Sequence, residues 1–92
     1  MTHAEGIMLA VAELLKQKGR STFSRQDVRE QIGVSPDDWQ LSYTAIFQAM
    51  RSDHPGGAPP IGARFRGVFR RVERGKYTLT DKGKQLLEEF RR

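Results

Sequence analysis

Two helix-start signals lie close together near the middle of this chain, and they constrain the fold more than any other feature. In the first, Ser24 stands three residues before Asp27, which is the spacing of a capping box. Phe23, just before the cap, can pack on the next helical turn as a hydrophobic staple. Gly33 supplies a stop signal. A short helix over about residues 25–32 is therefore predicted.

The second signal follows almost at once. Ser35 is the expected cap, Pro36 the first helical residue, and Asp38 the third. Large apolar side chains then recur at a spacing that places them within one arc of about 100°. They are Trp39, Tyr43, Ile46, Phe47 and Met50. We expect a third helix that starts at Pro36 and buries this arc.

Another helix is predicted ahead of these two, over residues 4–18, because apolar side chains recur at three- and four-residue spacing and Gly19 supplies a stop. The apolar positions are Ile7, Ala10, Val11, Leu14 and Leu15. Residues 52–63 are rich in Gly and Pro and are expected to form a loop.

Beyond that loop the pattern changes to that of a β-hairpin. Apolar side chains, at Phe65, Phe69, Val72, Tyr77 and Leu79, flank a turn at residues 73–76 that contains a glycine. Thr80 or Asp81 can cap a last helix, which carries Leu86, Leu87 and Phe90 and ends in Arg91 and Arg92. The expected fold class is α+β, with one domain over residues 1–92.

Composition narrows the possible functions. A chain of 92 residues has room for one small core and little more. It has no cysteine, and its two histidines, His3 and His54, have no second ligand at a suitable spacing, so we expect no metal or other cofactor. No nucleophile and base can be paired, so an enzyme is not expected. No signal peptide or membrane span is recognised, and we expect a cytoplasmic protein.

Charge is distributed unevenly along the chain. Residues 1–50 contain five cations and six anions, whereas residues 51–92 contain eleven cations and five anions. The net charge of +5 therefore belongs to the second half, and eleven of the sixteen cations are arginine. Arginine suits bidentate contact with phosphate, so an acidic partner is plausible.

The order of three helices, a hairpin and a closing helix resembles that of a winged helix-turn-helix domain. The segment FRRVERGKYTLTDKG, from Phe69 to Gly83, is similar to the wing and exit helix of many bacterial and archaeal members. The resemblance covers about residues 4–91 and assigns no subfamily. It implies a DNA-binding domain whose third helix enters the major groove. Two features depart from the pattern, the long loop before the hairpin and the aspartates Asp37 and Asp38 at the start of the third helix.

Three sets of residues are candidates for DNA contact. If the apolar arc is buried, the opposite side of the third helix presents side chains that can contact base edges, namely Gln40, Thr44, Gln48 and Arg51, beside Leu41 and Ala45. An ordinary solvated helix face explains the same pattern. Six cations within thirteen residues form the strongest signal, and these are Arg64, Arg66, Arg70, Arg71, Arg74 and Lys76. We expect them to form one continuous positive surface. Ser24 and Arg25 could add a phosphate contact, although local capping alone explains Ser24.

Two functions follow from these features. The first is a DNA-binding protein, either a small transcriptional regulator or the DNA-recognition module of a larger system, with the third helix in the major groove and the wing on the backbone. The alternative is a protein-interaction module, which Asp37 and Asp38 favour because they would repel phosphate. A monomer and a homodimer fit the sequence equally well.

Overall fold

The computed structural model describes residues 2–17, 20–52 and 63–90. Gly19, most of the Gly/Pro-rich loop with His54, and the terminal Arg91 and Arg92 lie outside the described residues. The expected α+β class is confirmed. In chain order the elements are α1 (His3–Leu15), α2 (Arg25–Ile32), α3 (Pro36–Ser42), α4 (Thr44–Ala49), the 3₁₀ helix η1 (Ala63–Phe65), β1 (Phe69–Glu73), β2 (Lys76–Leu79) and α5 (Asp81–Phe90).

Helix α1 begins at a capping box that the sequence analysis missed. The Thr2 hydroxyl accepts from the Glu5 N–H at 3.2 Å, and the Thr2 N–H donates to the Glu5 carboxylate at 3.3 Å. That backbone donor, helped by the Thr2 hydroxyl, lowers the pKa of Glu5 below its ordinary value of 4.5. The helix ends at Leu15, three residues earlier than predicted, because the next N–H groups bond back three residues rather than four.

The two helix starts near the middle of the chain are confirmed. The Ser24 hydroxyl accepts from the Asp27 N–H at 3.0 Å and the Asp27 carboxylate accepts from the Ser24 N–H at 2.9 Å, which closes the capping box. Gly33 ends α2 with φ of 90°, a conformation that only glycine adopts at little cost. The Ser35 hydroxyl then caps α3.

The third helix is not continuous, contrary to expectation. It divides into α3 and α4 at Tyr43, whose φ of −116° departs from helical values. The Thr44 hydroxyl donates to the Trp39 carbonyl at 3.3 Å, a side-chain bond of the kind that bends helices. Tyr43 itself lies between two rings, stacked on Trp39 with centroids 5.4 Å apart and against His3 at 4.4 Å. Local hydrogen bonding and ring packing thus hold the bend.

The hairpin pairs β1 and β2 in antiparallel register, with Phe69 opposite Leu79 and a bulge before the turn. Gly75 forms the turn with φ of 77°. An isolated bridge extends the pairing on one side, where Phe23 and Tyr77 exchange N–H to carbonyl bonds of 2.9 and 2.8 Å. This bridge, absent from the sequence prediction, fastens the start of α2 to the hairpin.

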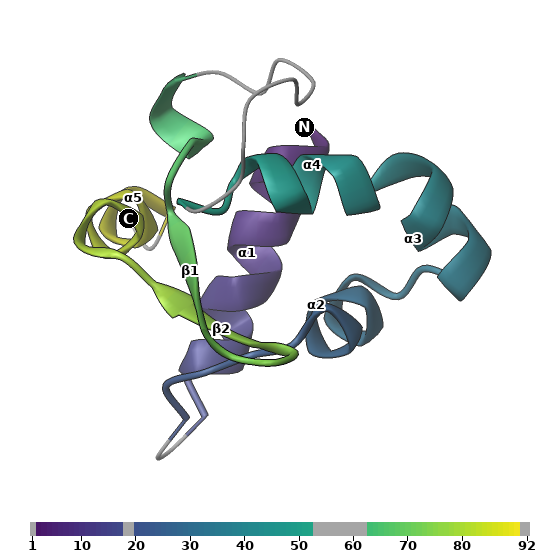
Figure 1. Ribbon diagram of the computed structural model, residues 1–92, viewed down its shortest axis with the longest axis horizontal. Helices are drawn as coiled ribbons and strands as arrows, with labels where there is room; N and C mark the ends of the chain where they lie inside the picture. Colours follow the sequence, from purple (N-terminus) through teal and green to yellow (C-terminus); the bar gives the residue numbers. More distant parts are fainter. Residues whose placement is uncertain (1, 18–19, 53–62, 91–92) are drawn as a thin grey trace.

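Helix α1 runs through the middle of the molecule and packs against α2, α4 and α5. Figure 1 shows α5 on one side of the hairpin and α2, α3 and α4 on the other. The largest fully buried side chains come from α1, α2, α4, the hairpin and the segments next to them, namely Tyr77, Phe23, Phe47, Phe69, Ile7, Met8, Met50, Val11, Val28 and Val68. Of the helices in the described ranges, none combines the length and apolarity needed to cross a membrane.

Candidate nucleic-acid interface

The start of α2 lies between two clefts that contain half of the predicted contact residues. The first, which we call the hairpin cleft, has a volume of about 650 Å³ and separates this helix start from the hairpin turn. It brings Ser24 together with Arg74 and Lys76. Residues far apart in sequence therefore meet, because the bridge between Phe23 and Tyr77 holds the turn beside the helix cap.

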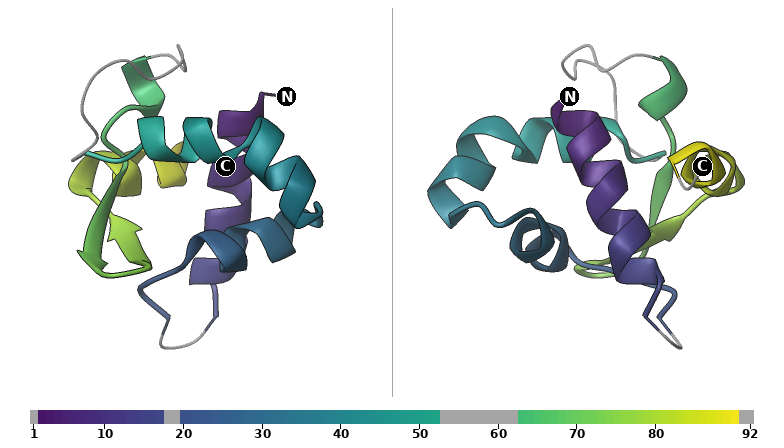
Figure 2. Two further views of the ribbon diagram at one scale, coloured as in Figure 1. Left: turned by 45° about the vertical axis from the view of Figure 1, so that its right-hand side comes forward. Right: turned by 180° about the vertical axis from the view of Figure 1, so that it is seen from behind.

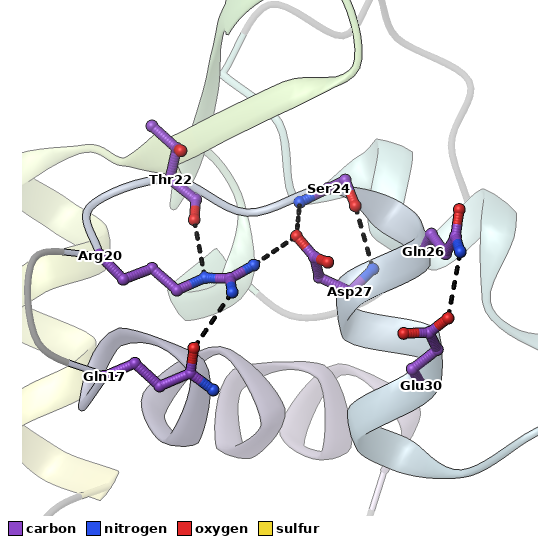
Figure 3. Close-up of polar contacts among 7 residues, drawn as sticks. All are labelled: Gln17, Arg20, Thr22, Ser24, Gln26, Asp27 and Glu30. Carbon is purple, nitrogen blue, oxygen red and sulfur yellow. Dashed lines mark hydrogen bonds and ion pairs between the residues drawn. The ribbon is translucent and has the colours of Figure 1, made fainter.

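Arg20 lines the hairpin cleft, a role for which the sequence offers no recognisable signal. Figure 3 shows its guanidinium among three acceptors: the Thr22 carbonyl at 3.1 Å, the Gln17 side chain at 3.2 Å and the Asp27 carboxylate. The same carboxylate oxygen accepts from the Ser24 N–H. Arg20 thereby links the end of α1 and the bridging segment to the first turn of α2.

The second cleft, here called the helix cleft, has a volume of about 430 Å³ and lies between α2 and α3. It brings together Arg25, Gln40 and Thr44 from the predicted set, with Arg29 added from α2. Arg25 and Gln40 are exposed, whereas the Arg29 guanidinium donates to the Val34 carbonyl at 3.2 Å. The two clefts thus share one wall, the first turn of α2.

The expected exposed stripe on the third helix is present only in part. Gln40 is exposed, but Thr44, Gln48 and Arg51 are all half-buried. The bend at Tyr43 rotates α4 relative to α3, and the Thr44 hydroxyl is committed to the Trp39 carbonyl. Arg51 bridges Phe69 through its backbone, and its guanidinium lies 5.4 Å from the Tyr77 ring centre. The other exposed residues of α3 include Asp37, Asp38 and Leu41.

The hairpin projects its cations into solvent. After the buried Phe69, every residue of β1 is exposed, including Val72 at 42%. Lys76 pairs with Glu73 at 3.1 Å, and both side chains are more than half exposed, so solvent screens this pair. Arg70, Arg71 and Arg74 form no ion pair with any described residue. Neighbouring strand residues point to opposite faces, so Arg70 and Arg71 present charge on both sides of the hairpin.

A single continuous positive surface, the expectation for all six cations, is wrong. Arg64 and Phe65 belong to the 3₁₀ helix η1 and not to a strand, and Arg66 lies in the turn that follows. The Arg64 guanidinium lies 4.8 Å from the Phe65 ring centre and 5.6 Å from that of Phe90. In Figure 1, η1 and the hairpin turn lie at opposite ends of the molecule. Alternation of polar and apolar residues could not distinguish a strand from a 3₁₀ turn over so short a segment.

Within the described ranges, no three of the side chains of His, Asp and Glu approach one another closely enough to hold a metal ion.

Comparisons with protein-family models, with curated proteins and with solved structures found no match to this chain.

Proposed function

We propose that this chain is a winged helix-turn-helix domain that binds duplex DNA. The observation that carries the proposal is the solvent-projecting hairpin, on which Arg70, Arg71 and Arg74 have no described carboxylate partner. Guanidinium groups in such a position bind phosphates of the DNA backbone or enter the minor groove.

The positions of α2 and α3 also support binding of duplex DNA. Helix α2 begins beside the hairpin turn, so the exposed Arg25 can contact the same backbone as Arg74. Helix α3 begins across the helix cleft from Arg25 and directs the exposed Gln40 into that cleft. In this arrangement the hairpin lies on the backbone while α3 and α4 face the major groove. The role is that of a small transcriptional regulator or of the DNA-recognition module of a larger system.

A salt titration tests the proposal directly. Binding of a fluorescent duplex is measured by anisotropy at about 50 and 200 mM salt. Three to four phosphate contacts predict a slope of log K against log salt of roughly −3 to −4 and a loss in affinity of about 10². Arg70→Glu with Arg71→Glu should abolish binding, while Lys82→Glu with Lys84→Glu on α5, where both lysines are exposed, serves as a control of matched charge change. Absence of binding at the lower salt concentration would refute the proposal.

One observation favours the alternative, a protein-interaction module. Leu41 is 84% exposed, and Asp37 and Asp38 lie one turn before it on the same short helix. A partner with basic side chains around an apolar one complements this surface better than a phosphate backbone does. Asp37→Asn with Asp38→Asn separates the two functions. The double variant gains DNA affinity if α3 lies against the duplex, and it leaves DNA affinity unchanged if α3 serves a protein.

A further inference from the structure

The side of α3 and α4 that would face the major groove has lost most of its capacity to read bases. Base discrimination needs exposed donors and acceptors at fixed positions, such as the amide of Gln or the fork of Arg. The Thr44 hydroxyl donates to the Trp39 carbonyl, and Thr44 is half-buried. Gln48 is half-buried as well, and the Arg51 guanidinium lies against the Tyr77 ring. Three of the four candidate reading residues are therefore only partly exposed, and two of them, Thr44 and Arg51, are engaged in other contacts.

Most residues that remain exposed on these helices are poor readers of DNA, whereas Ser42, also exposed, keeps a hydroxyl that can contact a base edge. Asp37 and Asp38 accept hydrogen bonds, but they repel the phosphates that flank any groove. Leu41 and Ala45 have no donor or acceptor on their side chains and can only touch a thymine methyl group. Gln40 is the one exposed side chain here with an amide suited to bidentate base contact.

The capacity to contact phosphate is, by contrast, retained by four arginines. Arg25, Arg70, Arg71 and Arg74 are exposed, and none of them forms an ion pair with a described residue. They lie on the hairpin and at the start of α2, both of which border the hairpin cleft or the helix cleft. Phosphate contacts fix position on a duplex but carry no sequence information directly.

We infer that the chain binds the backbone of duplex DNA with little discrimination among base sequences. This inference rests on the proposed DNA-binding function. It assigns affinity to the four exposed arginines and leaves the choice of a target sequence to another domain, chain or DNA structure. Preferences among duplexes should stay within a factor of about 10, compared with 10³ or more for typical sequence-specific proteins.

Competition among duplexes tests the inference. One labelled duplex is bound to the whole chain and displaced by unlabelled duplexes of equal length and unrelated sequence, including an A·T-rich and a G·C-rich one. A pool of random duplexes is also selected by retention and sequenced. The expected result is displacement at similar concentrations, within about tenfold, and no enriched motif. An enriched motif or a preference of 10³ would overturn the inference while leaving the proposed function intact.

Single substitutions in the same binding experiment separate phosphate contacts from base contacts. Arg71→Gln should weaken binding to every duplex by the same factor and reduce the magnitude of the salt slope by about 1. Lys84→Gln, a matched loss of one exposed charge on α5, should leave both quantities unchanged. A change in the order of preference among duplexes in Gln40→Ala or Gln48→Ala would overturn the inference. Failure of the unaltered chain to bind any duplex would refute the proposed function and this inference together.

Discussion

Arg20 shows how a single residue can fix the geometry of this interface. Its side chain is 27% exposed, yet its three guanidinium nitrogens each donate to a different acceptor. Because the Asp27 carboxylate also accepts from the Ser24 N–H, the helix cap and the ion pair depend on one oxygen. The position of the first turn of α2, and hence of Arg25, follows from this network.

Replacing Arg20 with Ala should lower the free energy of unfolding by about 1–2 kcal/mol, since it leaves the Asp27 carboxylate without its charged partner. Denaturation with urea, followed by circular dichroism, measures the change. Lys16→Ala is the control, because the ion pair of Lys16 with Glu13 is more than half exposed and should contribute less than about 0.5 kcal/mol. Equal effects of the two substitutions would contradict the structural role assigned to Arg20.

For single residues, the sequence predicts helix caps and stop signals better than other side-chain contacts. Ser24, Gly33 and Ser35 were predicted because caps and stop signals depend on residues within one helical turn. Thr2 and Glu5 form the same type of box and carry the same spacing, so that signal was available and unused. The contacts of Arg20 were not predicted, although the acceptors Gln17, Thr22 and Asp27 are close in sequence, since no spacing rule identifies an arginine in a connecting segment as a bridge between two helices.

The junction between α5 and the hairpin depends on the absence of a side chain. Thr80 caps α5, accepting from the Gly83 N–H at 3.1 Å, and donates to the Gly67 carbonyl at 2.6 Å. These bonds draw the first turn of α5 close to the backbone that precedes β1. A Cβ added at Gly83 would lie 2.1 Å from the Val68 carbonyl oxygen, far inside any permitted contact.

Gly83→Ala should therefore destabilise the protein by roughly 1–3 kcal/mol, because α5 has to move away from the hairpin. Gly6→Ala, within α1, is the matched control. No atom lies within 4 Å of a Cβ there, and alanine favours the helix, so stability should rise by about 0.5–1 kcal/mol. Thermal unfolding by calorimetry compares the two variants, and a Gly83→Ala protein as stable as the unaltered chain would contradict the close approach.

Hydrophobic periodicity predicted which helices exist better than it predicted whether each helix is continuous. The arc from Trp39 to Met50 is buried or half-buried as expected, but periodicity carries no information on the bend at Tyr43. That bend depends on the Thr44 hydroxyl and on the contact of Tyr43 with His3, which comes from another helix. The bend affects the prediction of the candidate site most, because the exposed stripe from Gln40 to Arg51 was derived on the assumption of an unbroken helix.

At the scale of the whole molecule, charge is divided between two ends. Arg74 lines the hairpin cleft and Arg25 lines the helix cleft, whereas Arg64 lies over the rings of Phe65 and Phe90 beside α5. Because Arg64, Arg66 and the hairpin cations are close in sequence, they were predicted to form one surface, although the chain turns between Arg66 and Arg70. A positive run along a sequence therefore overstates the surface that a single polyanion can contact.

This division predicts the footprint of a bound duplex. Titration of isotope-labelled protein with a short duplex, followed by nuclear magnetic resonance, should shift the arginine side-chain signals of Arg25, Arg70, Arg71 and Arg74. The signals of Arg64 should keep their positions, because its guanidinium lies on the rings next to α5 at the far end of the molecule from the hairpin turn.

Comparison at two salt concentrations provides the control for this footprint. Contacts with phosphate weaken steeply between about 50 and 200 mM salt, so the shifted signals should return toward their free positions together. Arg64 responding in step with Arg71 would mean that one duplex spans both ends of the molecule, which contradicts an interface confined to the hairpin and the start of α2. Shifts limited to Arg70, Arg71 and Arg74 would show that the hairpin binds without α2, since Arg25 is the member of this set that lies on α2.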